Sequence, residues 1–489
     1  MLLSKSDFLR YRICPSYFWL WKHESDLVPD NSTEEVRDNK FEQGNQVEAI
    51  ARRLFPRGVL VEGYNIQAQA NTNKLVADGA AVIFQATVIE DNLLAMADVL
   101  ERDGNGWILY EVKSSGEVKK DIHIPDMAFQ KIAFERAGYT INGTRIIHLN
   151  KEFVRHGKSI DPHAYFVTEN VDTAVSTIRP EVESQIALAL ENMSQAKAPA
   201  TCPCRLLSRG KHCPTFAYFN QDIPEYSVYD ISRMQGKKLA ELIDNEVFLT
   251  TDIPDDFTLS PNQTIQVSVD KSGRAIINRD KIHTELAQLE YPLYFIDYES
   301  VNPAIPMLDN TRPHQQVVFQ YSLHILDAPD AELRHTEFLC RDDTTESLHE
   351  LVAQMRQDIP TSGSVIVWNK SFEHTRNTEL GQLFPEFKDF FENVNSRVYD
   401  LMDIFRKNYY VEPGFRGSNS IKDVLPVLAP HLSYKDLAIG KGDLASVRWY
   451  EIAVGEDKSG ADQVFADLLE YCKLDTLAMV EIFNVLRRL

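Results

Sequence analysis

The sequence predicts an α/β protein with two such domains joined by a small, partly helical connector. Two strand-like runs at 96–100 and 107–113 flank the tight-turn residues 103–106, a pattern typical of a β-hairpin. A continuous apolar run at 293–296 is typical of a central strand buried on both faces. Residues 466–486 carry an apolar stripe at helical spacing. We therefore expect strands and helices in both halves of the chain.

Length and composition agree with this arrangement. A chain of 489 residues is too long for one typical core and suggests two to four domains. Changes in pattern place the domains at 1–220, 221–290 and 291–489. No stretch approaches the roughly 18 to 20 apolar residues of a membrane helix, and Asp7 and Arg10 interrupt any signal-peptide core. We therefore expect a cytoplasmic protein without a membrane association.

The net charge of −21 argues against a passive nucleic-acid coat, because such proteins are normally basic. It remains compatible with an enzyme that gathers metal-binding carboxylates and keeps a local basic groove. The candidates for that groove are Arg52, Arg53, Arg57, Lys119, Lys120, Lys131, Arg145, Arg155 and Lys158. For each of them the alternative is an ordinary solvated surface charge.

Helices and strands alternate in the elements expected before residue 220. A helix follows the N-cap Ser6–Asp7 and leads to the aromatic run 17–21. A second helix is expected at 42–54, and the segment 59–115 is rich in strand patterns. The remaining elements are a helix at 124–137, strands at 144–149 and 164–167, and a helix at 171–196.

The hairpin brings two acidic residues together. A turn centred on Gly104–Asn105 pairs residues whose numbers sum to 209, which sets Asp98 opposite Glu111. Lys113 lies on the same face as Glu111, because side chains alternate along a strand. Opposed like charges destabilise a strand pair by roughly 0.2–1 kcal/mol, and a divalent cation between them removes that penalty. We interpret the three residues as a metal site; the alternative is an amphipathic hairpin with surface charges.

Four of the six cysteines stand apart from the rest. They are Cys14 and the later trio Cys202, Cys204 and Cys213. Disulfides are rare in a reducing compartment, so we favour four thiolates that hold an iron–sulfur cluster. Zinc is the competing metal, although its usual cysteine pairs are separated by two to four residues and this pair by one. Unliganded thiols are the third interpretation, whereas Cys340 and Cys472 have apolar neighbours and fit a core.

A second set of acidic residues follows the connector, whose best helix candidate is 231–247. Asp297 and Glu299 stand two residues apart at the end of the apolar strand, hence on one face. Two carboxylates at a buried strand end are costly unless they are neutralised, which indicates a metal. A further apolar strand at 364–369 leads to Glu373 on the first turn of the next helix.

The helix expected near the C-terminus supplies two more polar residues. Tyr471 and Asp475 stand at i and i+4, so they project together beside the apolar stripe. Asp400 and Asp403 are alternative acids, although they also fit a role at a helix N-terminus. For the whole set, the alternative is an α/β domain with unrelated charges.

The triplet Glu111-Val112-Lys113, taken with Asp98, resembles the core of the PD-(D/E)XK nucleases. In that family the carboxylates hold Mg²⁺ or Mn²⁺, which polarises a scissile phosphate and lowers the pKa of bound water. The family lysine orients or deprotonates that water, or neutralises charge on the phosphate. The resemblance implies these roles for Asp98, Glu111 and Lys113.

The acidic set of the C-terminal half resembles that of the DEDD exonucleases, which have an RNase-H-like three-layer α/β fold. The matching residues are Asp297, Glu299, Glu373 and Asp475. Tyr471 fits the tyrosine subtype, because the histidine subtype would have histidine where Glu470 stands. In that family the acids hold two metals that clamp the attacking and leaving oxygens, and the tyrosine positions the attacking water. Glu373 departs from the family, which usually has aspartate there.

Nearly the whole chain looks like an uncharacterised family of bacterial proteins. That family joins a RecB-like PD-(D/E)XK nuclease domain to an RNase-H-like exonuclease domain. The motifs that carry the resemblance are Arg12-Ile13-Cys14-Pro15, Glu111-Val112-Lys113, Phe319–His324, Ser420-Ile421-Lys422 and Tyr471–Thr476. The first half is also similar to CRISPR-associated and AddB-type nucleases that carry an iron–sulfur cluster. This similarity implies a [4Fe–4S] cluster on Cys14, Cys202, Cys204 and Cys213.

Two departures from the RecB-like pattern concern the first domain. The family motif Gln-x-x-x-Tyr corresponds to Gln130 and Phe134, so the tyrosine hydroxyl is absent. Many RecB-like nucleases have a metal-ligand histidine shortly after a glycine in the first helix, but no histidine follows Gly44 here. Gln46 and Glu48 are the candidate substitutes.

The resemblance implies a metal-dependent DNase with two candidate active sites, acting in repair, recombination or defence. Its substrate would be single-stranded DNA or DNA with free ends, and a helicase or a defence-system protein is the implied partner. Two alternatives stay open. One is a nucleic-acid-binding scaffold with a degenerate first site, and the other is an RNA-directed exonuclease, since the RNase-H-like fold serves both polymers.

Overall fold

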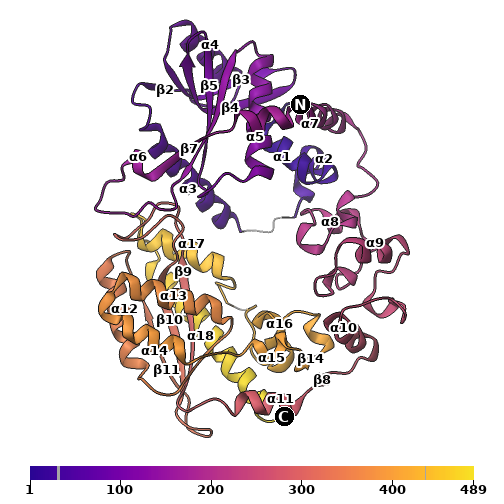
Figure 1. Cartoon of the computed structure of the whole chain (residues 1–489), viewed down its shortest axis with the longest axis vertical. Helices are drawn as coiled ribbons and strands as arrows, with labels where there is room; N and C mark the ends of the chain where they lie inside the picture. The colour runs from indigo at the N-terminus through magenta and orange to yellow at the C-terminus, as the bar shows by residue number, and fades with distance from the viewer. Residues whose placement is uncertain (30–32, 436) are drawn as a thin grey trace. The chain divides into compact units, whose positions relative to one another are not determined.

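The computed structural model describes residues 1–29, 33–435 and 437–489. Its contacts divide the chain into two compact units. The first contains Met1–Ile223 with two short segments, Ala304–Pro306 and Arg312–His314, and the second contains the remaining residues. The expected connector, 221–290, groups almost entirely with the second unit. Each unit is an α/β assembly (Figure 1), so the mixed α/β class predicted from the sequence is confirmed.

The first unit is built on one twisted sheet. Its strands are β1 (Leu3–Ser4), β2 (Gly58–Leu60), β3 (Val82–Glu90), β4 (Leu93–Asp103), β5 (Gly106–Lys113), β6 (Ile141–Leu149) and β7 (Phe166–Asn170). The order is β2-β3-β4-β5-β6-β7, with β1 parallel to the start of β4. The β3-β4-β5 meander and the β6–β7 pair are antiparallel, whereas β5 and β6 are parallel.

Helices cover both faces of this sheet. They are α1 (Lys5–Ile13), α2 (Pro15–His23), α3 (Glu34–Arg52), α4 (Ile66–Ala77), α5 (Lys120–Arg136), α6 (Pro162–Tyr165), α7 (Asp172–Ser194) and α8 (Phe216–Phe219). Leu109 and Ile146 face a core that includes Phe8 of α1 and Phe129 of α5. On the other face, Val47 and Ala51 of α3 pack against Ile147. The two rows of alternate strand residues therefore serve two cores.

The second unit has a five-stranded sheet. Its strands are β9 (Leu293–Val301), β10 (Val317–Leu326), β11 (Arg334–Leu339), β12 (Ser364–Val367) and β13 (Val398–Asp400), in the order β11-β10-β9-β12-β13. Strands β9, β10 and β11 are antiparallel neighbours, whereas β12 pairs in parallel with β9 and with β13. A separate pair joins β8 (Ile276–Ile277) to β14 (Tyr410–Val411).

The second sheet is covered on both faces. The helices of this unit are α9 (Gly236–Asp244), α10 (Pro261–Ser272), α11 (Arg279–Leu286), α12 (Thr345–Asp358), α13 (Lys370–Leu383), α14 (Lys388–Ser396), α15 (Asp403–Arg406), α16 (Ile421–Leu428), α17 (Gly442–Ala453) and α18 (Ala461–Leu486). Ile296 faces a core with Leu351 of α12, and Phe295 faces a second core with Phe483 of α18. Figure 1 shows α12, α13 and α14 grouped beside β9 and β10. The prediction that 293–296 is a strand buried on both faces is confirmed.

Several predicted boundaries differ from those observed. The first helix begins at Lys5, because Ser4 accepts a hydrogen bond from the Asp7 amide and forms a capping box with it. Ser6–Asp7 is therefore inside the helix. Helix α3 begins at Glu34 rather than near residue 42, and α4 lies in a segment expected to be strand-rich. The strand expected at 164–167 begins at Phe166, because the preceding residues close α6.

The hairpin turn is confirmed, whereas the opposition of its two acids is not. The β4–β5 ladder runs from Asp103↔Gly106 to Val99↔Tyr110 and ends one pair before Asp98. On the other side, the β3–β4 pairing skips Gln85 and Asp98, and Gln85 has a φ of 55°. In both strands, the alternation of side chains between the two faces of the sheet shifts by one residue at this irregularity. A bulge of this kind re-aims side chains, so the alternation assumed from the sequence fails at Asp98.

None of the helices within the described ranges is both long and apolar enough to cross a bilayer.

Candidate functional site

The acidic cluster of the second unit lies where β9 meets α18. Asp297 and Glu299 are on the same face of β9, because they are two residues apart in a continuous strand. Their carboxylate oxygens and the Cys472 Sγ of α18 lie within 4.8 Å of one another. Burial, and then the charge of Asp475, raise the pKa of Asp297 well above its usual value. The pKa of Glu299 is raised by burial and by the charges of Asp297 and Asp475.

Helix α18 places Asp475 in the same cluster. Asp475 is one turn beyond Tyr471, and both are buried. The Tyr434 hydroxyl donates a 2.6 Å hydrogen bond to Asp475 Oδ1. Burial raises the pKa of Asp475 to about 6, although hydrogen bonds from Tyr434 and Tyr471 and the charge of Lys422 act in the opposite direction.

Lys422 is a cation close to this cluster, and its charge opposes the rise in the pKa values of Asp297, Glu299 and Asp475. Its Nζ donates to the Gly440 carbonyl at 3.0 Å and to the Tyr471 hydroxyl at 3.3 Å. It also lies 5.4 Å and 5.3 Å from the ring centroids of Tyr434 and Tyr471. The lysine therefore fixes the position of the Tyr471 hydroxyl.

Glu373 is the fourth acid, on the first turn of α13 after β12. Its side chain is buried, and its Oε2 has no hydrogen-bond partner among the described residues. Burial and the charge of Asp297 raise the pKa of Glu373 well above its usual value. A buried carboxylate oxygen without a hydrogen-bond partner is costly in its charged form, which agrees with the raised pKa of Glu373.

Asp400 and Asp403, the alternative acids, have other roles. Asp400 accepts hydrogen bonds from the backbone amides of Asn369 and Lys370 and so caps the start of α13. Asp403 is paired with Arg406 and lies 3.3 Å from the Lys407 Nζ. The helix N-terminal interpretation is therefore the correct one for Asp400.

The four clustered acids are not balanced by ion pairs. Within the described parts of the chain, none of Asp297, Glu299, Glu373 and Asp475 has a lysine, arginine or histidine nitrogen within 4 Å. Oxygen-rich sites of this kind suit Mg²⁺ or Mn²⁺. The residues therefore fit a divalent cation. Their raised pKa values have burial as the main cause, followed for Asp297, Glu299 and Glu373 by the charges of neighbouring acids.

The acidic cluster of the first unit has a different electrostatic balance. Glu111 Oε1 accepts from the Lys5 Nζ at 2.6 Å and from the Lys113 Nζ at 2.7 Å, and its Oε2 accepts from Gln130 Nε2 at 2.6 Å. Asp126 of α5 accepts from Lys113 and Gln130. Burial opposes the charge of Glu111, but the two lysines lower its pKa to about 2. Both Glu111 oxygens are therefore already engaged by the protein.

Asp98 lies at the edge of this network. Its Oδ2 accepts from the Val112 amide at 2.7 Å, and its Oδ1 accepts from Gln85 at 3.3 Å. Gln85 also contacts Glu48, which adds a negative charge near Asp98. Burial and the charge of Glu111 raise the pKa of Asp98 to about 8. Of Gln46 and Glu48, the two candidate residues after Gly44, Glu48 faces this network, whereas Gln46 donates to Glu42.

Sequence patterns missed several residues of these clusters. Lys5, Asp126 and Tyr434 belong to no recognisable spacing, because each reaches its partners from a different element. Lys422 belongs to the motif Ser420-Ile421-Lys422, but the sequence alone does not indicate its contact with Tyr471. Phe134 is fully buried and its ring packs edge-on against Tyr139 at 5.4 Å, so it serves the core.

The four predicted cysteines converge in the first unit. All are buried, and their sulfur atoms lie within 4.8 Å of one another, with none in a disulfide. Cys14 Sγ is 3.3 Å from Cys202 Sγ, which is 3.5 Å from Cys213 Sγ. A tetrahedral ion with Zn–S bonds of about 2.3 Å separates its sulfurs by about 3.8 Å. This thiol cluster could therefore hold a metal.

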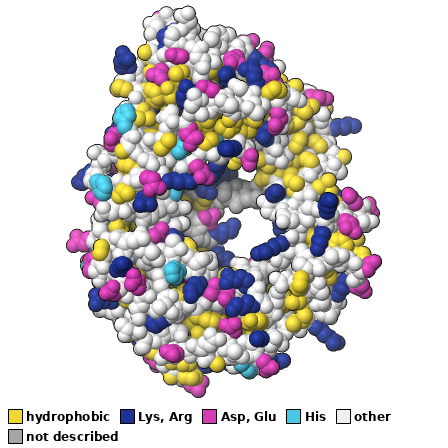
Figure 2. All heavy atoms as spheres, viewed as in Figure 1, with side chains coloured by type: hydrophobic (Ala, Val, Ile, Leu, Met, Phe, Trp, Pro, Cys, Tyr) yellow, Lys and Arg dark blue, Asp and Glu magenta, His cyan; other side chains and the backbone are white. Residues whose placement is uncertain are grey.

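Some members of the expected basic groove have structural partners. Arg52 pairs with Glu48, Lys131 with Glu135, and Arg145 with Asp172. Arg155 donates to the Gly157 carbonyl. Figure 2 shows basic and acidic side chains interspersed over the visible face rather than one continuous basic surface.

The fold and these clusters define a mixed α/β protein with a buried carboxylate site and a thiol site. Residues 294–420 match the family model described as a domain of unknown function (DUF2779). That segment includes Asp297, Glu299 and Glu373, and it ends before Lys422 and α18.

Three curated relatives are similar to parts of the chain. Uncharacterized protein MG366 of Mycoplasma genitalium is 28% identical over 233 residues, 43% of this chain and 34% of that protein. Uncharacterized protein UU173 of Ureaplasma parvum is 27% identical over 294 residues, 54% of this chain and 41% of that protein. The MG366 homolog of Mycoplasma pneumoniae is 27% identical over 236 residues, 44% of this chain and 34% of its own length. The chain thus matches about a third to two fifths of the length of these relatives.

Proposed function

We propose that this protein is a metal-dependent nuclease whose main active site is the acidic cluster of the second unit. The observation that carries the proposal is a set of four carboxylates without ion-pair partners among the described residues, half-buried at Asp297 and buried at Glu299, Glu373 and Asp475. One oxygen of Glu373 also has no hydrogen-bond donor among these residues. Such a set is expensive to bury unless cations neutralise it.

The strand order supports the resemblance to the DEDD exonucleases. Numbered from β9 as the first strand, the order β11-β10-β9-β12-β13 reads 3-2-1-4-5. The first three strands are antiparallel and the last two are parallel to the first, as expected for an RNase-H-like sheet. The acids lie on the central strand, on the helix after the fourth strand and on the C-terminal helix, as that resemblance implies.

Each polar residue has a proposed role in phosphodiester hydrolysis. Asp297, Glu299, Glu373 and Asp475 would hold Mg²⁺ or Mn²⁺, which supplies Lewis-acid polarisation of the phosphate and acidifies a bound water. The Tyr471 hydroxyl, held by Lys422, would orient the attacking water. Lys422 would also offset negative charge that develops on the phosphate.

The first unit supports a second, weaker site. Its Asp98, Glu111 and Lys113 match the PD-(D/E)XK pattern, but Lys5 and Lys113 already neutralise Glu111. A metal at Glu111 would have to displace the Lys5 ammonium. This arrangement favours the alternative in which the first unit binds nucleic acid with a degenerate site, while cleavage occurs in the second.

We also propose that the thiol cluster holds a metal centre. The sulfur separations suit a single tetrahedral ion such as zinc, whereas an iron–sulfur cluster, which fills the centre of its ligand set, needs the sulfurs farther apart. The single residue between Cys202 and Cys204 favours the cluster. Analysis of iron, zinc and acid-labile sulfide in anaerobically purified protein distinguishes a zinc ion from an iron–sulfur cluster. A protein that contains neither metal would reject a metal role for the thiols.

The activity test uses labelled single-stranded DNA and an RNA of the same sequence, each with Mg²⁺ or Mn²⁺. We expect the wild type to degrade the DNA. Asp475→Asn should lower the rate by about 100-fold or more, because it removes a metal-ligand charge, whereas Asp403→Asn should have little effect. Lys113→Ala tests the first unit separately. Faster degradation of the RNA than of the DNA would support the RNA-directed alternative. Unchanged degradation by an Asp475→Asn/Lys113→Ala double variant would reject the proposal.

A further inference from the structure

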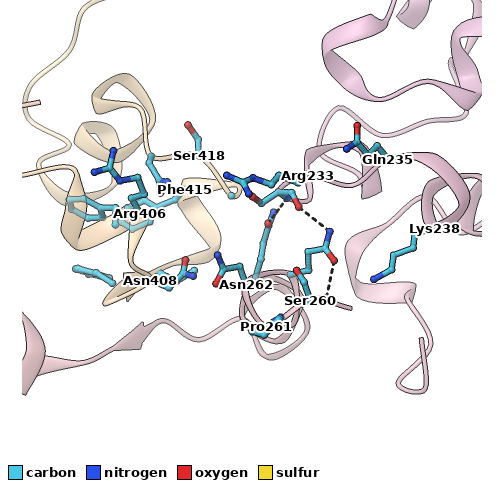
Figure 3. Close-up of a pocket in the computed structure, with 18 residues that line it drawn as sticks. Arg233, Gln235, Lys238, Ser260, Pro261, Asn262, Arg406, Asn408, Phe415 and Ser418 are labelled. Atoms are coloured by element: carbon cyan, nitrogen blue, oxygen red, sulfur yellow. Dashed lines mark hydrogen bonds between the residues drawn. The ribbon is translucent and has the colours of Figure 1, made fainter. Parts of the chain in front are cut away.

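A cavity of about 760 Å³ lies within the second unit, away from the acidic cluster. This volume falls within the roughly 300–1,000 Å³ of ligand pockets. One side is formed by the α9–α10 region and the other by residues 405–419 (Figure 3). The two sides are in direct contact, because a Cβ on Gly417 would come within 2.1 Å of the Gln266 side chain of α10. The cavity therefore has a fixed frame.

The lining of this cavity has an unusual charge. The chain contains 72 acidic residues, yet none of the described residues that line the cavity is Asp or Glu. Three lining residues are cationic: Arg233 and Lys238 on one side and Arg406 on the other (Figure 3). In a protein with a net charge of −21, an acid-free and basic cavity is a local site for an anion.

Two of these cations are available to a ligand. Arg233 and Lys238 form no ion pair with any residue in the described ranges, whereas Arg406 is paired with Asp403. Helix α10 begins at the cavity with Ser260 and Pro261, so its N-terminal dipole also favours negative charge there. Asn262, Asn408 and Ser418 add neutral hydrogen-bonding groups to the lining.

One short segment of the chain connects the cavity lining to the acidic cluster. Asn419 lines the cavity, and its carbonyl accepts a 3.1 Å hydrogen bond from Trp368, which immediately follows β12. Lys422, three residues later in α16, contacts the Tyr471 hydroxyl of the acidic cluster. Asn419 precedes α16 and is three residues from Lys422, so part of the cavity lining and a contact of the acidic cluster lie on one short segment of the chain.

We infer that this cavity binds the phosphodiester backbone of a single nucleic-acid strand whose end lies at the acidic cluster. The inference rests on the proposed nuclease function and specifies how the second unit holds its substrate. Arg233 and Lys238 contact phosphates, and the amide groups of Asn262 and Asn408 donate to phosphate or sugar oxygens. Such contacts position a strand without reading its sequence.

The test measures binding without cleavage. Fluorescence anisotropy of a labelled 15-nucleotide oligo(dT) is recorded with full-length Asp475→Asn protein in 100 mM KCl. On this background, Arg233→Gln/Lys238→Gln should weaken binding about tenfold, because two phosphate contacts are lost. The matched control is Lys237→Gln, which removes an exposed charge from the same helix outside the cavity lining and should change binding less than twofold.

Equal binding by the double variant and the Lys237→Gln control would overturn the inference, even if the wild type cleaves DNA. Conversely, a wild type that never cleaves but whose binding depends on Arg233 and Lys238 would overturn the proposed function and leave the binding site standing. Deoxythymidine monophosphate provides a third arm. We expect the mononucleotide to compete only at concentrations far above those of the oligonucleotide. Competition at equal concentration would indicate that the cavity binds a free nucleotide rather than a nucleic-acid strand.

Discussion

At the scale of single residues, the two acidic clusters differ in what balances their charge. In the first unit, Glu111 has two lysines within 2.7 Å. In the second unit, Glu373 has an unpaired oxygen and repels Asp297. The first cluster is therefore stable as it stands, whereas the second is a site under electrostatic strain that cation binding would relieve.

This difference predicts the behaviour of Glu373→Gln. The amide removes a buried charge and its repulsion with Asp297, so we expect the melting temperature in EDTA to stay the same or rise by a few degrees. The increase in melting temperature on adding Mg²⁺ should become smaller than in the wild type. Glu379→Gln is the control, because Glu379 lies on the same helix but pairs with Arg376. A Mg²⁺ response that Glu373→Gln leaves unchanged would contradict the assignment.

The pKa of Asp475 predicts how stability depends on pH. Its folded-state pKa is raised to about 6, above the usual value of 3.8, so the folded protein binds this proton more tightly than the unfolded chain does. The stability from that proton is fully present below about pH 4 and is lost as the pH rises through about 6. Because metal binding needs the deprotonated carboxylate, we expect Mg²⁺ to stabilise the protein more at pH 8 than at pH 5.

Thermal unfolding at both pH values, with EDTA or with Mg²⁺, measures this effect. Asp475→Asn should reduce the difference between the two Mg²⁺ responses. An equal response of the wild type at both pH values would contradict the link between Asp475 ionisation and cation binding.

The acids on β9 could be predicted from the sequence because a strand has a fixed two-residue period, which places Asp297 and Glu299 on one face. Lys5 could not, because its contact with Glu111 depends on how α1 packs against the sheet. The predicted hairpin register is observed from Asp103↔Gly106 to Val99↔Tyr110, but the ladder ends before Asp98, because the irregularity at Gln85 interrupts the alternation there. Local periodicity thus predicts partners within an element and misses those between elements.

At the scale of elements, the thiol cluster connects the start of the first unit to its end. Cys14 lies between α1 and α2, whereas the other three cysteines follow α7. The Ser16 hydroxyl also donates to the Thr201 carbonyl at 2.8 Å. A metal on these thiols would hold the N-terminal helices against the sheet, where Phe8 stacks on Phe129 at 5.1 Å.

We therefore predict that Cys14→Ser removes the bound metal and destabilises the protein. The loss should lower the melting temperature by about 10 °C or more, because binding of a structural metal contributes directly to folding. Cys340→Ser is the control, since Cys340 is equally buried but lies outside the thiol cluster. Metal content and thermal unfolding are measured for both. A Cys14→Ser protein that keeps its full metal content would refute the assignment.

Element predictions were most accurate where a segment is long and strongly patterned. The hairpin strands, α7 and α18 match the expected ranges closely. Helix α4 was missed, because its polar residues and short length carry no strong stripe. The start of α3 was also missed, because the helix begins with a run of charged residues that Thr33 caps.

At the scale of the whole molecule, the net charge of −21 limits how this protein can bind a polyanion. Three members of the basic groove expected from the sequence, Arg52, Lys131 and Arg145, pair with acids. If the proposals above hold, Arg233 and Lys238 of the cavity and the cations bound at the acidic cluster supply the specific contacts in the second unit. Neither the cavity nor its lack of acids could be predicted from the sequence, because its lining comes from distant segments.

A small number of phosphate contacts predicts a weak dependence of nucleic-acid binding on salt. With about three contacts, the slope of log K against log [KCl] should be about −2, so affinity falls about 16-fold between 50 and 200 mM KCl. A basic coat protein with seven or more contacts would instead show a slope near −5. Anisotropy of oligo(dT) with Asp475→Asn protein across this range measures the slope. Arg233→Gln/Lys238→Gln should make the slope shallower by about one to two units, because binding with fewer phosphate contacts releases fewer counterions from the DNA. A slope of −5 in the parent protein would contradict this account, since it would require a basic surface much larger than the cavity provides.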